Sequence, residues 1–155
     1  MFWRTVVGLA FLAASCWAQD QIEMYKNCPE GWSGIRVVDA TGHEVFSICQ
    51  LGWPSPDRTR FVHLTSSKAP DLFYVTIAGA KVLRASIYRK QGARYKCLGQ
   101  FTGFSIEPVV WNGRLVIRYE QLMPQMERPE HFVYFVWDGE DFLPTEPVDP
   151  LAYQH

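Results

Sequence analysis

The sequence predicts an all-β, mainly antiparallel domain, built from hairpins and meanders as a sandwich or a partly open barrel. Three observations predict it. Apolar residues alternate with polar ones along most of the chain after residue 18, helical periodicity is nearly absent, and glycine-containing turn dipeptides separate the alternating runs. Aromatic residues make up 15% of the chain and charged residues 20%, which is typical of an ordered globular protein.

Residues 1–18 have the layout of a cleaved secretory signal peptide. Arg4 precedes an apolar run from Val6 to Ala14, which is far shorter than the roughly twenty residues of a membrane-crossing helix. Cys16 and Ala18 are the small residues that signal peptidase requires, so Gln19 becomes the N-terminus. The alternatives are a lipoprotein acylated at Cys16 and a buried strand. We therefore expect a secreted or periplasmic protein without a transmembrane segment.

Residues 19–155 are expected to form a single β-rich domain that begins with a hairpin over 19–52. The dipeptide Thr41-Gly42 supplies its turn. Cys28 and Cys49 enclose this hairpin, so we predict that they form a disulfide, which is worth about 3 kcal/mol in the chain-entropy model. Cys97 then remains a free thiol, and its place in a strand predicts burial as a small apolar side chain.

The rest of the chain divides into a connection over 53–70, a main sheet over 71–143 and an extended tail over 144–155. Alternating runs predict strands with one core face and one face in or near solvent. The run from His131 to Trp137 is apolar on both faces and predicts a central strand. Further turns are expected where glycine dipeptides separate these runs: Ala78-Gly79, Gln91-Gly92, Asn112-Gly113 and Asp138-Gly139.

Two segments, 72–98 and 114–143, each show the pattern of three antiparallel strands, with a glycine turn and then an aromatic residue between the second and third. This pattern resembles the repeating units of extracellular β-propellers. Two units cannot close a propeller, which needs at least four blades. The repeat therefore predicts two stacked meanders, and no propeller function is carried over.

Charge is distributed unevenly, although the whole chain has a formal net charge of only −1. Residues 72–106 contain six basic residues and no acid, whereas residues 119–155 contain eight acids and one arginine. Alternation along the strands predicts a cationic strip suited to an anionic polymer or an acidic protein, made of Arg84, Tyr88, Arg114 and Arg118. In the alternative interpretation, the basic and acidic regions neutralise each other. Nothing indicates a nucleic-acid partner.

No motif predicts catalysis, a metal site or a cofactor. The four histidines lack the short ligand spacing of zinc sites. The acidic turn at Asp138-Gly139-Glu140-Asp141 lacks the EF-hand pattern, and a Gly-x-Ser-x-Gly elbow is absent. An enzyme remains the rival interpretation.

The sequence therefore predicts an exported, non-catalytic binding module for a protein or a charged polymer. Alternatives are an inhibitor of extracytoplasmic enzymes, a small secreted hydrolase and a structural piece of an envelope assembly. Gly92-Ala93-Arg94-Tyr95 looks like part of the Ser-Gly-x-x-Tyr loop of periplasmic lysozyme inhibitors. Gln91 stands in place of the serine and the cysteine pattern differs, so no family is assigned.

Overall fold

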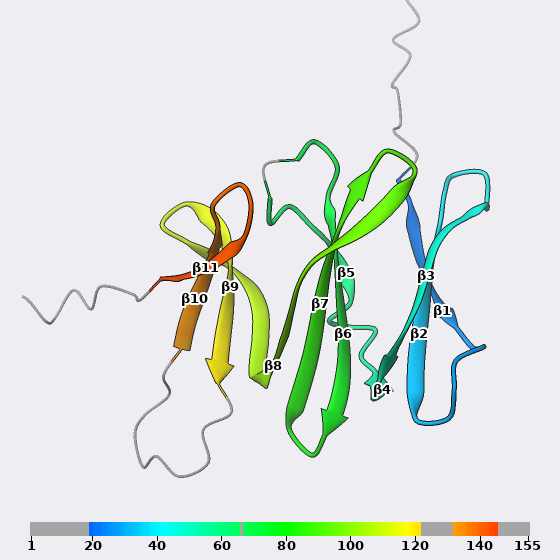
Figure 1. Ribbon diagram of the computed structural model, residues 1–155, viewed down its shortest axis with the longest axis horizontal. Helices are drawn as coiled ribbons and strands as arrows, with labels where there is room; N and C mark the ends of the chain where they lie inside the picture. The colour runs from blue at the N-terminus through cyan, green and yellow to red at the C-terminus, as the bar shows by residue number, and fades with distance from the viewer. Residues whose placement is uncertain (1–18, 66, 122–131, 146–155) are drawn as a thin grey trace, which may run out of the picture.

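The computed structural model describes residues 19–65, 67–121 and 132–145 (Figure 1). Within these ranges the chain is all-β and antiparallel, as predicted, with eleven strands and no helix. Accordingly, the described residues contain no helix that could cross a membrane. The predicted leader, 1–18, and most of the predicted tail, 146–155, lie outside the described residues.

The N-terminal region is a three-stranded sheet rather than a two-stranded hairpin. It is formed by β1 (Gln21–Tyr25), β2 (Trp32–Val38) and β3 (Glu44–Leu51), in that order. The predicted turn between β2 and β3 is present: Gly42 has a φ of +82°, and the Asp39 carboxylate accepts hydrogen bonds from the backbone N–H groups of Thr41 and His43. The Thr41 hydroxyl also donates to this carboxylate, at 2.6 Å, and it lowers the pKa of Asp39 most, followed by the two backbone bonds.

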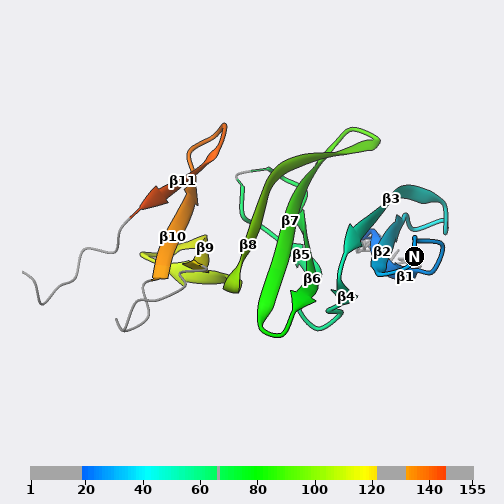
Figure 2. The ribbon, with the colours of Figure 1, turned by 60° about the horizontal axis from the view of Figure 1, so that its bottom comes forward.

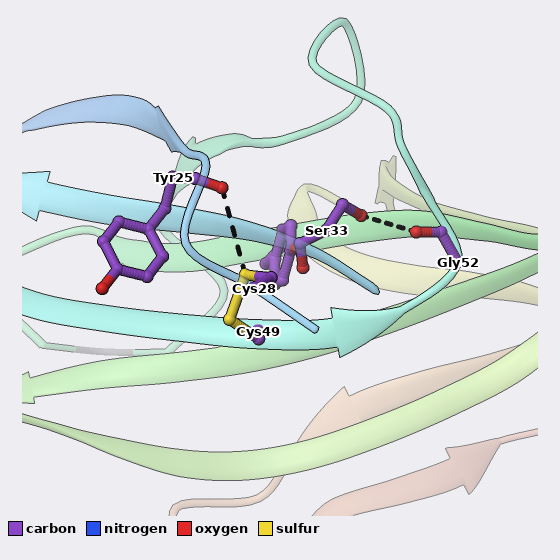
Figure 3. Close-up of a disulfide and its surroundings, with 6 residues drawn as sticks. Tyr25, Cys28, Ser33, Cys49 and Gly52 are labelled. Carbon is purple, nitrogen blue, oxygen red and sulfur yellow. Dashed lines mark hydrogen bonds between the residues drawn. A yellow bond between two sulfur atoms is a disulfide. The ribbon is translucent and has the colours of Figure 1, made fainter. Parts of the chain in front are cut away.

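The disulfide between Cys28 and Cys49 is present as predicted (Figure 3). It lies over Gly34 of β2. A Cβ atom on Gly34 would meet the Cys28 sulfur at 2.3 Å and the Ile48 carbonyl oxygen at 2.9 Å. Glycine therefore lets the sulfur approach the backbone. On the neighbouring residue, the Ser33 hydroxyl donates a hydrogen bond to the Gly52 carbonyl at 2.7 Å (Figure 3).

The second sheet contains the remaining eight strands. Its hydrogen-bonded order is β11-β10-β9-β8-β7-β6-β4, and β5 also pairs with β6. The strands are β4 (Trp53–Pro54), β5 (Arg60–Val62), β6 (Asp71–Gly79), β7 (Val82–Gln91), β8 (Arg94–Trp111), β9 (Arg114–Gln121), β10 (Phe132–Trp137) and β11 (Phe142–Thr145). The predicted connection thus contains two short edge strands, and the predicted tail begins within β11.

One long strand, β8, begins in the first predicted meander and runs beyond it to pair with the second, so the two meanders form one sheet (Figures 1 and 2). It pairs with β7 as far as Gly103 and with β9 from Gly103 to Trp111. A Cβ atom on Gly103 would lie 2.4 Å from the Glu120 carbonyl oxygen and 2.7 Å from the Tyr119 ring. The absence of a side chain at Gly103 therefore lets β9 pack closely where β8 exchanges one partner for the other.

Two hydrophobic clusters cover opposite faces of β6 and β7. On one face, Phe73 and Ile87 pack against residues of β8 to β11. On the other face, Leu72 and Tyr88 pack against the N-terminal sheet. Residues 71–76 are all buried, so the prediction that one face of this strand lies in or near solvent is wrong. Alternation identified its two faces but not the sheet that covers the second one.

The strand buried on both faces is therefore β6, and the prediction of a doubly covered strand at 131–137 is wrong. In β10 only Trp137 is buried, and the other residues are partly exposed. The prediction for Cys97 is confirmed in part: the thiol is free but exposed. Tyr88 pairs with Cys97 and Ile87 with Gly99, so Leu98 bulges out of register and packs against the core instead.

A buried polar network joins the two sheets. The Gln50 side-chain amide donates to the Thr76 hydroxyl at 2.7 Å and to the Arg84 carbonyl at 3.1 Å. The Ser86 hydroxyl donates to the Gln50 amide oxygen at 2.5 Å. Gln50, Thr76 and Ser86 are all buried. Their side chains therefore need hydrogen-bond partners within the protein, and they provide these partners for one another.

The predicted turns are present with small shifts in register. Asn112 and Gly113 both have positive φ, as a type I′ hairpin requires. At the Asp138-Gly139 turn, the Asp138 N–H donates to the Asp141 carbonyl, so Gly139 and Glu140 are the central residues. The turn predicted at Ala78-Gly79 is centred two residues later, where Lys81 has a φ of +143°.

Candidate functional site

The residues of the predicted cationic strip do not form one exposed surface. Tyr88 is 3% exposed and packs in the cluster beneath the N-terminal sheet, 5.0 Å from the Phe46 ring. The prediction of an exposed Tyr88 is therefore wrong. Arg84 is partly buried on the same strand, and its carbonyl accepts the hydrogen bond from Gln50.

The other two arginines lie on β9 and already have partners. Arg118 forms an ion pair with Glu107 and lies over the Phe132 ring, whereas Arg114 donates to the Trp137 carbonyl. The positions on β8 that pair with Arg84, Arg118 and Arg114 are 102, 107 and 111. At about 3.3 Å per residue, Arg84 is about 16 Å and 30 Å along the strand from the other two. The strip is not continuous.

Basic and aromatic side chains instead converge on a pocket of about 450 Å³ beside the start of β1. Its walls come from the residues before β1, from β5 and the segment that follows it, and from the hairpin of β7 and β8. The lining residues are Gln19, Asp20, Phe61, His63, Lys68, Ala69, Pro70, Lys90 and Tyr95.

Asp20 joins the start of β1 to the hairpin of β7 and β8. Its carboxylate lies 2.6 Å from the Lys90 ammonium and accepts a hydrogen bond of 2.8 Å from the Tyr95 hydroxyl. Burial and, secondarily, the hydrogen bond to Asp20 raise the pKa of Tyr95 well above its usual range. Tyr95 therefore remains a neutral donor, and the Asp20 charge is matched by Lys90.

The opposite wall carries His63 and Lys68, which are both exposed. Asp71 anchors this wall, because its fully buried carboxylate accepts hydrogen bonds from the Leu64 and Thr65 backbone N–H groups at 3.1 and 2.9 Å. Lys68 has no ion-pair partner among the described residues. Since Lys90 offsets Asp20, Lys68 leaves the pocket with an excess of positive charge.

The pocket lining carries more basic than acidic groups, which suits the binding of an anion. It contains no cysteine, serine or threonine that would act as a nucleophile. The part of the chain that the structure describes contains no group of three metal-ligating side chains. At the acidic turn, the Asp138 carboxylate accepts hydrogen bonds from the backbone N–H groups of Asp141 and Glu140. These bonds lower the pKa of Asp138. The geometry of the turn therefore explains the acidic cluster.

No protein-family model, curated protein or solved structure matches this chain. The role of the pocket is therefore inferred from its own side chains. Of these, the sequence marks Lys90, which is one of the six basic residues of 72–106, and Tyr95, in the segment after Gly92. Asp20, Phe61, His63 and Lys68 carried no signal in the sequence, because each is brought to the pocket by pairing between distant segments.

The buried tyrosines predict unfolding in alkali. Burial raises the pKa of Tyr88 from its ordinary value of 10.0 to about 12. The neutral phenol therefore contributes stability that is complete below pH 10 and is lost as the pH rises from 10 to about 12. We expect tyrosinate absorbance and the loss of circular dichroism to rise together in this range, and Tyr88→Phe to delay both. Full tyrosine ionisation with an unchanged circular dichroism spectrum would contradict this expectation.

Proposed function

We propose that this chain is an exported, non-catalytic binding module, cleaved after Ala18 and built as an antiparallel β-sandwich, which binds a carboxylate-bearing segment of a protein or polymer. The observation that carries the proposal is the composition of the pocket at the start of β1. Two lysines and a histidine line it against one carboxylate, and Asp20 is already engaged by Lys90 and Tyr95.

The arrangement of the pocket supports this proposal. Lys68 and His63 lie on one wall as exposed donors, and Phe61, Pro70 and Tyr95 provide apolar surface for the uncharged part of a ligand. Ion pairs with exposed donors contribute only about 0–1 kcal/mol each, so binding here requires the apolar surface as well as the charges. The Cys28–Cys49 disulfide is consistent with export, because disulfides persist in oxidising compartments.

The inhibitor alternative has less support. In the β7–β8 hairpin, Gly92, Ala93 and Arg94 are exposed, but the Tyr95 ring packs 5.0 Å from Phe46 and its hydroxyl binds Asp20. The aromatic residue that would be displayed at the tip of an inhibitory loop therefore points inward.

The proposal is tested by titrating the secreted chain with labelled poly-L-glutamate and, separately, with labelled polygalacturonate, which represent a protein and a polysaccharide source of carboxylates. We expect Lys68→Glu to weaken binding of the preferred probe at least tenfold, which corresponds to about 1.4 kcal/mol. Lys68 is chosen because it is exposed and has no hydrogen bond or ion pair among the described residues, so its replacement leaves the Asp20 contacts intact.

The matched control is Lys26→Glu, which makes the same charge change at an exposed lysine in the β1–β2 loop. It should reduce binding only slightly, through the overall charge. Equal losses in the two variants would show that binding depends on net charge and not on the pocket. Failure of both probes to bind would reject the proposed ligand chemistry.

A further inference from the structure

A second concave surface lies elsewhere on the larger sheet and shares no residue with the pocket. This groove, of about 590 Å³, is lined by Arg58, Ile77, Lys81, Leu83, Phe104 and Glu120. These residues come from the turn before β5, the end of the β6–β7 hairpin, the middle of β8 and the end of β9. Three irregularities of the backbone build it.

The first irregularity is the β-bulge in β8 at Phe104. Gly103 pairs with Gln121 and Ser105 with Glu120, so Phe104 has no partner on β9. Bulges redirect side chains and are common beside functional sites. Here the bulge leaves a large apolar ring 42% exposed in the groove, although the next core residue of the strand, Ile106, is 1% exposed.

The second irregularity is the backbone of Lys81, whose φ is +143°. A residue other than glycine rarely occupies this region, and such strained positions cluster at active sites and ligand-binding sites. The third is the turn that carries Arg58. The Arg58 N–H donates to the Ser55 carbonyl, and the adjacent Thr59 hydroxyl accepts the Val75 N–H at 3.1 Å. The turn is thereby attached to β6.

Apolar surface continues beyond the floor of the groove. Trp53 pairs directly with Ile77 across the β4–β6 ladder, and directly paired residues point to the same face of a sheet. Trp53 is 67% exposed. Tryptophan and arginine are the side chains most enriched at the energetic centres of protein interfaces, and both stand beside this groove.

We propose that this surface docks an extended segment of a partner protein, in which an apolar side chain is flanked by acidic residues. The apolar side chain would contact Phe104, Ile77 and Trp53. Its acidic neighbours would pair with Arg58 and Lys81, which have no ion-pair partner among the described residues. This site is independent of the proposed function, because no residue of the pocket takes part.

The test uses a capped, fluorescent peptide with a leucine between glutamates, titrated against the full chain by fluorescence anisotropy. We expect Phe104→Ala to weaken binding about tenfold, as at other interface centres, with an unchanged melting temperature. Val110→Ala removes a more exposed apolar side chain from the same strand and is the matched control. It should leave the affinity unchanged.

Lys81→Gly separates a structural role from a binding role. Glycine tolerates a φ of +143°, so this variant should melt at the same or a higher temperature while binding the peptide at least threefold more weakly. An unchanged affinity in both Phe104→Ala and Lys81→Gly would overturn the proposal. So would equal binding of a peptide with alanine in place of leucine, because attraction between charges alone would then explain the binding. Because a glutamate peptide also suits the proposed pocket, each of these titrations is made in the Lys68→Glu background, so that failure here is distinguishable from failure of the pocket.

Discussion

Replacing Gly103 by alanine is expected to lower the free energy of unfolding by about 3 kcal/mol, the upper end of the usual cost of overpacking a core. The new Cβ atom would meet the Glu120 carbonyl oxygen at 2.4 Å, and a backbone atom in a sheet cannot rotate away as a side chain can. The strain would separate β9 from β8 at the point where the long strand exchanges its partners. Urea unfolding followed by tryptophan fluorescence measures the effect.

Gly79→Ala is the matched control for this substitution. Gly79 also lies in the larger sheet, but an added Cβ atom would have no neighbour within 4 Å, and its φ is not positive. This variant should change the free energy of unfolding by less than about 0.5 kcal/mol. If the two alanine variants unfold at the same urea concentration, the close approach of β8 and β9 at Gly103 does not contribute to stability as we infer.

Loss of the disulfide should have an effect of similar size. Replacing Cys28 and Cys49 together by serine removes a crosslink between residues 21 positions apart, and the chain-entropy model gives about 3 kcal/mol for a loop of this length. Part of this cost should depend on Gly34, because the Cys28 sulfur lies only 2.3 Å from the position that a Cβ atom there would take.

A double-mutant cycle isolates that dependence. Gly34→Ala should destabilise the crosslinked protein by about 2 kcal/mol or more and the serine variant by less, since the serine side chain is free to move away. A smaller cost should remain, because the Ile48 carbonyl still lies 2.9 Å from the new atom. Strict additivity of the two changes would show that the disulfide does not limit the space above Gly34.

The sequence allowed most strands and turns to be predicted, because their causes are local. Alternation marks a strand through its period of two, and Asn112-Gly113 adopts positive φ wherever a two-residue hairpin forms. Alternation also separated Leu72 from Phe73 correctly onto different faces. It did not show that the N-terminal sheet covers the Leu72 face, because periodicity states which residues share a face and not what packs against it.

The candidate sites could not be predicted for the same physical reason. Asp20 meets Lys90 from 70 residues away, and Phe61 reaches the pocket through the pairing of β5 with β6. The bulges had an equally strong effect. One extra residue at Leu98 left Cys97 exposed, and another placed Phe104 in the groove. A single-residue insertion in a ladder leaves no mark in composition, yet it changes which side chains face solvent.

The hydrogen bonds of Gln50 have a consequence for how uniquely the fold is specified. Contacts between apolar side chains tolerate sliding, since one aliphatic neighbour can replace another at little cost. The Gln50 amide does not tolerate it, because its oxygen accepts from Ser86 while its nitrogen donates to Thr76 and to the Arg84 carbonyl. A shifted arrangement of the two sheets would leave these buried polar groups without hydrogen-bond partners, at a cost of about 1–3 kcal/mol for each group. The network therefore favours one alignment of the two sheets over slightly shifted alignments.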